Sequence, residues 1–436
     1  MNHIAIIADD LTGASDSGVQ FARKCLATQV IFDLSYFAAE TGDIDAVVVD
    51  TDSRADAPQD AYRRVRDTAS QVYRAGFQHF YKKMDSTLRG NLGAEIDAVM
   101  DEIPFDFAVV APAFPKIGRT TLHGVHSLNG LPIHQTEIAQ DPKCPVKQSN
   151  LVDLFASQSR RKVGLIALDQ LHSGPEAVFA RINALLKEQI ELIVFDAVTE
   201  DDMRQIAEMM ATSDYKILWA GSAGIADYLP KALSLPSRSD TRHEMTLSGK
   251  PVLLAAGSIS KVTRSQVAAF NLNSNVTAVE LDAVRMISTE EGRLQEIARC
   301  QAVLLKALSR GSDVSLYASS SPEQVQLSKS AGADRGLDDT EVSNRIANTL
   351  GEIASSIVQQ VQLQGVILTG GDTAKAVCRH LGVTGIQLLE EIEPGIPLGK
   401  LIGKMPLWVV TKAGAFGNEQ SLLHAQHVLK GESSNE

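Results

Sequence analysis

Cysteine is scarce in this chain and never occurs at short spacing. Among the 436 residues there are 4 cysteines, and no CxxC or mixed Cys/His pattern joins them. Disulfide frameworks and zinc sites both need clustered ligands, so the sequence indicates neither. A reducing cytoplasm is therefore the compartment that we expect. The four positions are Cys25, Cys144, Cys300 and Cys378.

Long apolar runs are missing as well. The longest candidates, such as residues 107–114 (FAVVAPAF), have the length of a strand, whereas a membrane helix needs about 18 or more apolar residues. The first residues carry no basic stretch, and Asp9 and Asp10 fall where a signal peptide would still be apolar. We expect neither a membrane span nor export.

Basic residues are in the minority. Lys and Arg number 41 against 53 Asp and Glu, which gives a formal net charge of −12 and a pI near 5.4. This sign argues against non-specific nucleic-acid binding, which needs an excess of basic residues. The hydrophobic share of 44% is ordinary for a globular protein, and the length allows two or three domains.

What recurs along the chain is a short β-branched run, a turn rich in Gly, Asp or Ser, and a stretch with 3.6-residue apolar spacing. This order is typical of α/β folds with mainly parallel sheets. The predicted strands are residues 4–8, 46–50, 77–82, 107–111, 163–168, 192–196, 217–220, 252–256, 314–318, 366–369 and 407–411, and a long helix is predicted over 344–361.

The periodic pattern stops at residues 230–250, where Ser, Pro and alternating charges take over. We therefore predict two α/β domains, residues 1–235 and 250–436, joined by a linker over 236–249, with the active site in the cleft between them. Residues 111–146 contain five prolines and no helical period. That segment is longer than a plain loop of about 12–15 residues, so we expect it to be functional.

Several catalytic motifs are absent. The string nearest to a phosphate-binding P-loop, residues 395–401 (GIPLGKL), is one residue short and lacks the Ser or Thr that would hold magnesium. No GxSxG or HExxH occurs, so neither a serine hydrolase nor a zinc peptidase is indicated. His123 and His126 have no third ligand in register, and loop hydrogen bonding is the favoured interpretation of this pair.

Polar residues follow the first three predicted strands of the first domain. The first strand ends in Asp9 and Asp10, the second continues into residues 50–54 (DTDSR), and the third into residues 82–91 (KKMDSTLRGN). Ligands bind beyond the carboxyl ends of parallel strands, so these side chains predict one site. Its carboxylates suit a hydroxyl group, and its Lys and Arg side chains suit a small carboxylate or phosphate.

The second domain has three glycine-containing turns between a predicted strand and the start of a helix. They are residues 255–261 (AAGSISK), 368–375 (LTGGDTAK) and 411–418 (TKAGAFGN). Such turns expose backbone N–H groups to an anion, and the dipole of the following helix favours negative charge. Three in one domain predict a nucleotide-binding site.

Two other functions remain open on these residues alone. Asp50 and Asp52 after an apolar strand resemble the start of a haloacid-dehalogenase-type phosphatase motif, although Ser53 and Arg54 do not complete it. An intracellular ligand sensor is the other alternative, but no DNA-binding helix pair or basic face accompanies it.

Four strings together resemble the four-carbon acid sugar kinase family, and within it the branch that acts on D-threonate. They are IIADDLTGASDSGVQFA, YKKMDSTLRGNLGAEI, APAFPKIGRTTLHGVHSLNGLPIHQTE and LTGGDTA, and the resemblance extends over nearly the whole chain. It implies an N-terminal domain that binds the acid sugar, a C-terminal domain that binds ATP, and phosphorylation of the terminal (4-) hydroxyl with ATP and Mg²⁺. D-erythronate and 3-oxo-tetronate remain alternative substrates, because these motifs do not read the configuration of one carbon.

The resemblance also implies the site residues. Substrate contacts are expected at Asp9, Asp10, Arg54, Lys82, Lys83, Met84 and Asp85, and ATP contacts at Ser258, Gly370, Gly371, Asp372, Thr373 and Gly414. Our mechanistic hypothesis is that Arg54 and Lys83 hold the carboxylate of the acid, and that Asp10 or Asp85 accepts the proton of the attacking hydroxyl. The metal ligands are left open, with Asp372 one candidate, and a homodimer is the expected assembly.

Overall fold

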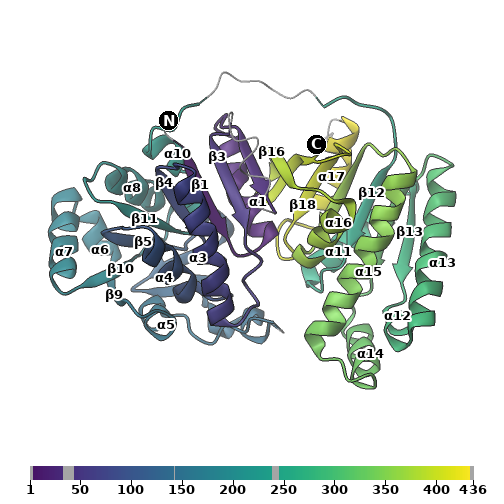
Figure 1. The fold of residues 1–436 in the computed structure, drawn as a ribbon, viewed down its shortest axis with the longest axis horizontal. Coiled ribbons are helices and arrows are strands. Elements are labelled where there is room, and N and C mark those ends of the chain that lie inside the picture. The colour runs from purple at the N-terminus through teal and green to yellow at the C-terminus, as the bar shows by residue number, and fades with distance from the viewer. Residues whose placement is uncertain (1–2, 33–43, 142, 238–244, 433–436) are drawn as a thin grey trace. The chain divides into compact units, whose positions relative to one another are not determined.

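The computed structural model describes residues 3–32, 44–141, 143–237 and 245–432. The chain divides into two compact units, residues 1–241 (unit 1) and 242–436 (unit 2). The division falls within the predicted linker 236–249, of which residues 238–244 lie outside the described part. Each unit is a sheet flanked by helices (Figure 1), which confirms the predicted class of two α/β domains.

Unit 1 is built on a parallel sheet. Among its described residues, eight strands take the order β2-β3-β1-β4-β11-β5-β10-β9, each parallel to its neighbours. The strands are β1 (Ile4–Ala8), β2 (Thr28–Ile31), β3 (Ala46–Asp50), β4 (His79–Lys83), β5 (Phe107–Ala111), β9 (Lys162–Ile166), β10 (Ile190–Phe195) and β11 (Ile217–Gly221). The helices are α1 (Leu11–Ala22), α3 (Pro58–Arg74), α4 (Leu92–Glu102), α5 (Leu151–Gln158), α6 (Leu168–His172), α7 (Pro175–Lys187), α8 (Glu200–Ala211), α9 (Ala223–Ala226) and α10 (Leu229–Ala232).

The core of unit 1 explains why the apolar runs form these strands. Every residue of β1, β3 and β5 is buried, as expected of parallel strands with helices on both faces. The covering helices are amphipathic. In α3, for example, Ala61, Val65, Ala69 and Val72 recur at helical spacing and are buried.

The proline-rich segment leaves this parallel sheet. It forms a small antiparallel sheet of β6 (Arg119–Leu122), β7 (Val125–Leu128) and β8 (Leu131–Pro132), with 3₁₀ turns η3 (Pro115–Ile117), η4 (Ile133–Gln135) and η5 (Glu137–Gln140). The absence of a helical period in the sequence agrees with this structure.

Unit 2 has a mixed sheet. Its described strands take the order β13-β14-β12-β15-β18-β17-β16, parallel from β13 to β18 and antiparallel in the last two pairs. They are β12 (Val252–Ala256), β13 (Val276–Leu281), β14 (Asp313–Ala318), β15 (Gly365–Thr369), β16 (Gly385–Glu393), β17 (Ile396–Ile402) and β18 (Trp408–Lys412). The helices are α11 (Lys261–Asn271), α12 (Ala283–Ser288), α13 (Glu290–Leu308), α14 (Pro322–Ala333), α15 (Asp339–Gln360), α16 (Gly371–Leu381) and α17 (Ser421–Lys430).

Every strand predicted from an apolar run is present, with ends that shift by at most two residues. The predictions missed β2, β13, β16, β17 and the small antiparallel sheet, and the predicted helix 344–361 begins earlier, at Asp339, because Asp338 caps it. The string GIPLGKL lies largely in β17, which confirms that it is not a phosphate-binding loop. None of the described helices combines the length and apolarity needed to cross a membrane.

Candidate active site

The polar strand ends of unit 1 are neighbours in space. The order β3-β1-β4 places the carboxyl end of β1, with Asp9 and Asp10, between the ends of β3 and β4. Arg54 follows β3, and Lys83 is the last residue of β4. The structure thus gathers at one edge of the sheet the side chains that the sequence singled out.

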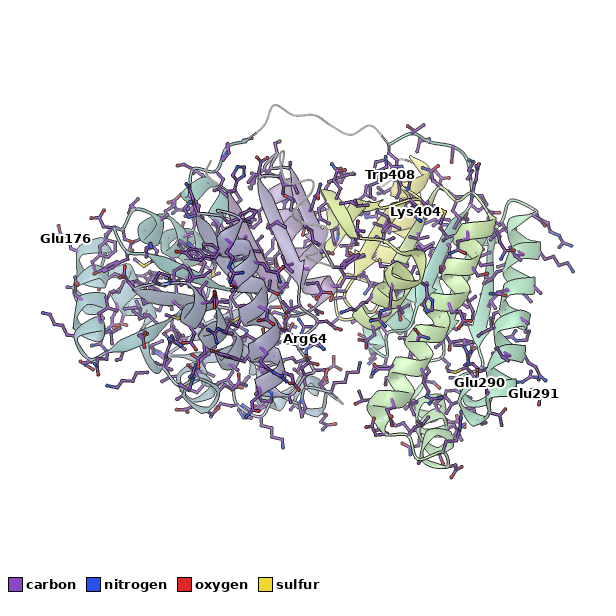
Figure 2. All side chains as sticks on the ribbon, viewed as in Figure 1. Arg64, Glu176, Glu290, Glu291, Lys404 and Trp408 are labelled. Carbon is purple, nitrogen blue, oxygen red and sulfur yellow. The ribbon has the colours of Figure 1, made fainter. Side chains whose placement is uncertain are left out.

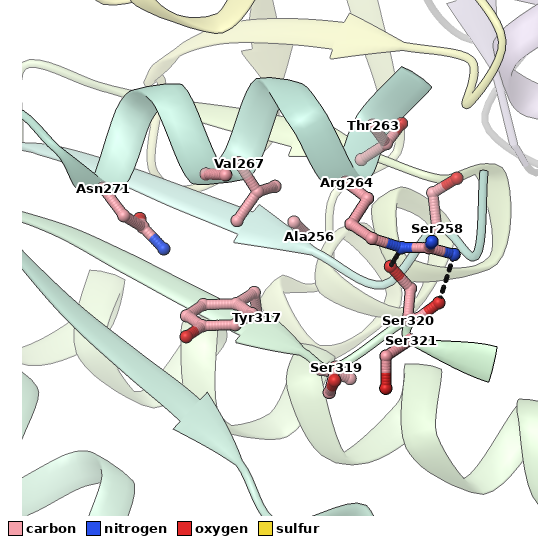
Figure 3. Close-up of a pocket in the computed structure, with 12 residues that line it drawn as sticks. Ala256, Ser258, Thr263, Arg264, Val267, Asn271, Tyr317, Ser319, Ser320 and Ser321 are labelled. Atoms are coloured by element: carbon pink, nitrogen blue, oxygen red, sulfur yellow. Dashed lines mark hydrogen bonds between the residues drawn. The ribbon is translucent and has the colours of Figure 1, made fainter. Parts of the chain in front are cut away.

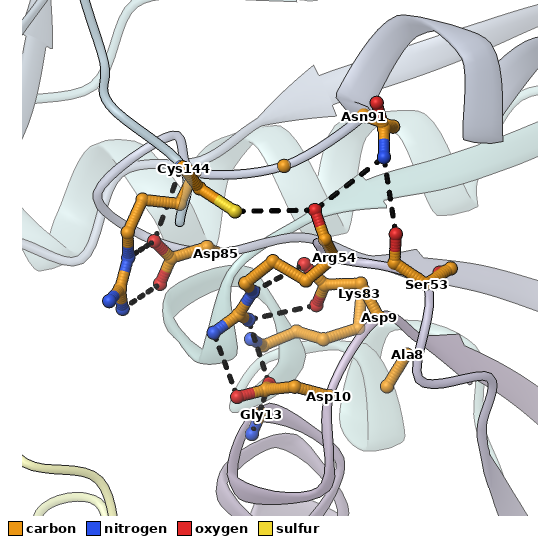
Figure 4. Close-up of polar contacts among 12 residues, drawn as sticks. Ala8, Asp9, Asp10, Gly13, Ser53, Arg54, Lys83, Asp85, Asn91 and Cys144 are labelled. Carbon is orange, nitrogen blue, oxygen red and sulfur yellow. Dashed lines mark hydrogen bonds and ion pairs between the residues drawn. The ribbon is translucent and has the colours of Figure 1, made fainter. Parts of the chain in front are cut away.

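Arg54 lies at the centre of this cluster, between two carboxylates (Figure 4). Its Nε and Nη2 donate to the Asp9 Oδ2 and Oδ1 at 2.8 and 2.9 Å, and its Nη1 and Nη2 donate to the Asp10 Oδ2 and Oδ1 at 2.7 Å each. Most N–H groups of the Arg54 guanidinium therefore donate to carboxylates of the protein itself. This differs from the hypothesis that Arg54 holds the substrate carboxylate, because four of its five N–H groups are already engaged.

The charges of this cluster stabilise one another. Burial alone would raise the pKa of Asp9, but the Arg54, Lys82 and Lys83 charges outweigh it and lower that pKa. The same carboxylates raise the pKa of Arg54 well above its ordinary value, against the effect of burial. The Asp9 carboxylate is thus ionised, and it is 1% exposed.

Asp10 also sets the start of α1. Its Oδ1 accepts the N–H of Gly13 at 2.8 Å, and its Oδ2 accepts the hydroxyl of Thr12 at 2.6 Å, so Asp10 is the N-cap of the helix. A Cβ on Gly13 would lie 2.5 Å from the Asp10 Oδ1 and 2.9 Å from the Lys83 Nζ. A side chain at position 13 would therefore displace the Asp10 carboxylate and the Lys83 ammonium, which both approach the backbone.

Lys83 is the cation of this cluster with capacity for a ligand. Its side chain is 3% exposed, and among the described residues its ammonium makes no hydrogen bond or ion pair. The ammonium lies 2.9 Å from the position that a Gly13 Cβ would occupy, near Asp10 and Arg54. A largely buried lysine whose ammonium has no bonded anion is suited to a carboxylate or phosphoryl group, which would pair with its charge.

Lys82 was predicted to contact the substrate, but its ammonium is used inside unit 1. The Nζ forms a 2.7 Å ion pair with the Glu95 Oε2 and donates to the carbonyls of Ile7 at 3.2 Å and Lys83 at 2.7 Å. These three partners occupy its three N–H groups. Ser53 donates to the other Glu95 oxygen at 2.6 Å, so Glu95 ties the ends of β3 and β4 to α4.

Met84 was also predicted as a substrate contact, and it too is engaged within the fold. Its side chain is 1% exposed and belongs to the hydrophobic core, while its N–H donates to the carbonyl of Gly221 at 2.8 Å. A contact of Met84 with substrate would have to use its backbone carbonyl.

Asp85 pairs with Arg89 on the loop after β4. Arg89 Nε and the hydroxyl of Thr87 donate to the Asp85 Oδ2 at 2.7 and 2.5 Å. Burial opposes ionisation of Asp85, but the Arg89 and Arg54 charges overcome it and hold its pKa well below the usual range. A carboxylate this stable is a weak proton acceptor, so Asp85 is better suited to orient a hydroxyl or position Arg89.

The proline-rich segment reaches this site, which the sequence did not predict in detail. Asp141 accepts from the Arg89 Nη1 at 3.2 Å, and the Cys144 thiol contacts the carbonyl of Arg54 at 3.4 Å. The buried His126 lies 3.0 Å from the carbonyl of Ser86 and 2.9 Å from the Thr121 hydroxyl, and burial lowers its pKa to about 4. His126 is therefore a neutral hydrogen-bonding group, and it lies in strand β7 and not in a loop as expected.

In unit 2 the three glycine turns converge on Ser258. A Cβ on Gly370 would lie 3.2 Å from the Ser258 N, and one on Gly414 would lie 2.3 Å from the Ser258 Oγ. Gly257 faces Thr373, whose Oγ1 would lie 2.1 Å from a Cβ at that position. The structure thus brings together the residues predicted to contact ATP, Ser258, Gly370, Gly371, Asp372, Thr373 and Gly414, at the ends of β12, β15 and β18.

The helices after these turns differ from the others of unit 2 at their first residue. The side chains of Asp282, Thr289, Ser321 and Asp338 cap α12, α13, α14 and α15. Figure 2 labels Glu290 and Glu291, which add acidic charge to the first turn of α13. By contrast, α11, α16 and α17 begin without a side-chain cap. Their first N–H groups are thus suited to an anion.

A pocket of about 180 Å³ has Ser258 in its lining (Figure 3). Ala256, Val267, Ala268 and the ring of Tyr317 provide apolar surface, and the polar part includes Arg264, Asn271 and the three serines after β14. Arg264 donates through Nε to the Ser320 Oγ at 3.3 Å, which fixes this end of the pocket. Sequence reasoning missed this pocket because its residues come from α11 and from the turn after β14, which carries no glycine signal.

The described residues contain no group of three or more His, Cys, Asp or Glu side chains arranged to hold a metal ion. Asp372, in the first turn of α16, is the acidic residue of the glycine-turn cluster. One carboxylate beside several phosphates is the donor set that Mg²⁺ commonly uses with nucleotides. Magnesium at Asp372 therefore stays a prediction that depends on a bound nucleotide.

Comparison with known proteins agrees with the two units. A family described as a sugar-binding N-terminal domain matches residues 4–229, and a nucleotide-binding C-terminal domain matches residues 253–422. The chain is 35% identical to a D-threonate kinase of Salmonella typhimurium over 98% of both chains. It belongs to the four-carbon acid sugar kinase family.

Other members of the acid sugar kinase family act on different acids. The chain is 34% identical to a D-erythronate kinase of Heliobacterium modesticaldum (100% of this chain, 99% of the relative) and 30% identical to a 3-oxo-tetronate kinase of Pseudomonas savastanoi (98% and 97%). A crystal structure of a Haemophilus influenzae protein matches with a TM-score of 0.72 at 26% identity, over 98% of this chain and 100% of that one. The curated relatives are all named as kinases, and the acid in their names varies.

Proposed function

We propose that this kinase transfers the terminal phosphoryl group of ATP to the 4-hydroxyl of D-threonate. The reaction class follows from the family, and D-threonate is the substrate of the relative with 35% identity. The D-erythronate and 3-oxo-tetronate kinases, at 34% and 30%, make these two acids the competing substrates. The three acids share a carboxylate and a terminal hydroxyl, so one arrangement of charges serves them all.

The observation that carries the proposal is the ammonium of Lys83, which ends a largely buried side chain and has no hydrogen bond or ion pair within the described residues. A carboxylate of the acid would be the anion that it lacks there. Arg54 then has a positioning role, because it fixes Asp9 and Asp10 through four hydrogen bonds. Asp10 is 19% exposed against 1% for Asp9, which makes Asp10 the better candidate to orient the attacking hydroxyl.

A strong base is not required for this reaction. Phosphoryl transfer passes through a loose transition state, so positioning and charge neutralisation supply most of the rate. Asp10 accepts from Arg54, Gly13 and Thr12, and Asp85 accepts from Arg89 and Thr87. Carboxylates bonded this way are rigid, and we assign Asp10 and Asp85 to orientation of the hydroxyl during transfer.

We place the nucleotide in unit 2. The N–H groups at Ser258, at Gly370–Thr373 and at Gly414 would hold the phosphates, with Asp372 beside Mg²⁺. The pocket next to Ser258 would take the adenosine, its ring against Val267 and Tyr317.

The first experiment measures ADP release from ATP and Mg²⁺ with D-threonate, L-threonate, D-erythronate, L-erythronate and 3-oxo-tetronates. We expect ADP to form stoichiometrically with D-threonate, and Lys83→Met to raise the KM for the acid by at least about tenfold. Lys187→Met, at an exposed position of α7, is the matched control and should leave both KM values unchanged. Release of phosphate from phospho-sugars without acid-dependent ADP would refute the kinase assignment and direct attention to Asp50 and Asp52.

We further propose a cytoplasmic location, since all four cysteines are free thiols in the structure. A homodimer stays a prediction, which sedimentation equilibrium of the full chain tests.

A further inference from the structure

Lys412 ends β18 with its ammonium buried beneath the third glycine turn. The side chain is 1% exposed. Its Nζ lies 2.7, 3.2 and 3.1 Å from the carbonyl oxygens of Ala413, Gly414 and Phe416, and 3.2 Å from the Thr263 Oγ1. Within the described ranges it forms no ion pair with a carboxylate. The turn is thus wrapped around a cation with its carbonyls pointing inward.

The carbonyl groups of this turn do not need Lys412 to satisfy them. Ala413 O also accepts the N–H of Phe416 at 3.2 Å, and Gly414 O accepts the Thr263 hydroxyl at 2.9 Å. Phe416 O accepts the Gln266 side chain at 3.0 Å. An apolar side chain at position 412 would therefore leave each carbonyl with a hydrogen bond.

The ammonium itself is expensive to bury. Desolvation lowers the pKa of Lys412 to about 7, against a weaker opposing effect of the Glu393 charge. A neutral side chain would avoid this cost, and the carbonyls would remain paired. A lysine at this position therefore has a purpose other than stability of the fold.

The direction of the peptides indicates that purpose. In a trans peptide the N–H points opposite to the C=O, so carbonyls that face Lys412 turn the N–H groups of Gly414, Ala415 and Gly417 away from it. In the described part of the chain these N–H groups have no hydrogen-bond partner, and Ala415 and Gly417 are exposed. Successive outward N–H groups form an anion-binding concavity, and a cation behind the peptides strengthens it.

We propose that Lys412 is a positioning residue for the phosphates of the nucleotide, which it attracts through the peptide groups of residues 413–417 without touching them. The inference rests on the proposed nucleotide site in unit 2. It adds to that site a buried positive charge that none of the predicted ATP contacts provides, since Ser258, Thr373 and the glycines are neutral and Asp372 is acidic.

The test compares Lys412→Met and Lys412→Arg with the wild-type chain by calorimetric titration of ADP, inorganic pyrophosphate and D-threonate. We expect Lys412→Met to weaken binding of both phosphate ligands by about tenfold and to leave binding of the acid unchanged. Lys412→Arg should restore part of the affinity, because it restores the charge. Lys306→Met, at an exposed position of α13, is the matched control.

The outcomes separate this inference from the proposed function. A wild-type chain that binds neither ADP nor pyrophosphate refutes the nucleotide site itself. A folded Lys412→Met variant that binds both ligands as the wild type does refutes the role of Lys412. If Lys412→Met does not fold, Lys412→Gln removes the charge but keeps hydrogen-bond donors toward the turn, and pyrophosphate affinity unchanged in that variant overturns the inference.

Discussion

The Lys82 ammonium and the Glu95 carboxylate form a 2.7 Å ion pair in which each side chain is 1% exposed. Lys83, the next residue, has its ammonium beside Gly13 instead. Adjacent residues of a strand point to opposite faces, so β4 sends one lysine to the interior and the other to the candidate site. Two neighbouring residues of the same type therefore have different roles.

Substitution of Glu95 should destabilise unit 1 strongly. Glu95→Ala leaves the buried Lys82 ammonium without its carboxylate, and we expect a loss of about 3–5 kcal/mol in the free energy of unfolding. Urea denaturation measures it. Glu102→Ala on the same helix breaks a partly exposed pair with Arg66 and should cost less than about 1 kcal/mol. Similar losses in the two variants would contradict the structural role of the Lys82–Glu95 pair.

Gly370 should be needed for nucleotide binding. Its φ is +94°, and a Cβ would lie 3.2 Å from the Ser258 N, so Gly370→Ala strains the turn and crowds the neighbouring turn. We expect ADP affinity to fall by about tenfold or more in a binding titration. Gly382→Ala is the matched control at the end of α16, since Gly382 has φ +63° with open space around it. An equal loss in the control would mean that backbone strain alone explains the effect.

Asp10→Asn should lower kcat for the acid by about 10²-fold with little change in the KM for ATP, because it removes the charge that orients the hydroxyl. Steady-state kinetics with each substrate varied in turn measures both values. Asp50→Asn is the comparison variant, since the Asp50 Oδ1 accepts the Asp52 N–H at 2.9 Å in a turn. A larger loss of kcat in Asp50→Asn would favour the phosphatase-like alternative.

Asp85 should contribute to stability in a pH-dependent way. Its pKa is well below the usual value in the folded protein, so ionised Asp85 stabilises the fold above the unfolded pKa of about 3.9. The difference in unfolding free energy between wild type and Asp85→Asn should be constant above about pH 5 and shrink as the pH falls below about 4. Chemical denaturation at several pH values measures this difference, and a difference that does not change down to about pH 3 would contradict the assignment.

The apolar runs predicted the strands well because buried parallel strands have a strong hydrophobic signal. They missed β13, an edge strand in which Thr277, Ala278 and Glu280 are not buried, and the antiparallel strands β16 and β17. The edge strand β13 is too polar to be recognised as an apolar run. In β16, apolar residues alternate irregularly with Gln387, Glu390 and Glu391. These strands form because they pair with residues distant in the sequence, and such pairing gives no clear pattern in the local sequence.

Residue types at strand ends predicted where the candidate site lies, but not how each side chain is used. Lys82 and Lys83 are adjacent residues of the same type, so the sequence does not show which of them faces the candidate site. The register of β4 in the sheet decides this. The engagement of Arg54 with Asp9 and Asp10 joins residues 45 and 44 positions apart, which spacing cannot reveal. Lys412 lies within one of the predicted glycine turns, yet its burial and the inward carbonyls around it depend on how that turn folds.

The three helices that begin without side-chain caps have a consequence for engineering. Loss of a capping side chain to Ala costs about 0.5–2 kcal/mol and to Gly only a few tenths, so new caps at the starts of α11 and α17 would stabilise unit 2 more than one at α16, where Gly370 is the N-cap. A screen for heat resistance would select substitutions near these positions first. At α16 such a variant would cover N–H groups that we assign to phosphate, so higher thermal stability would be accompanied by weaker catalysis.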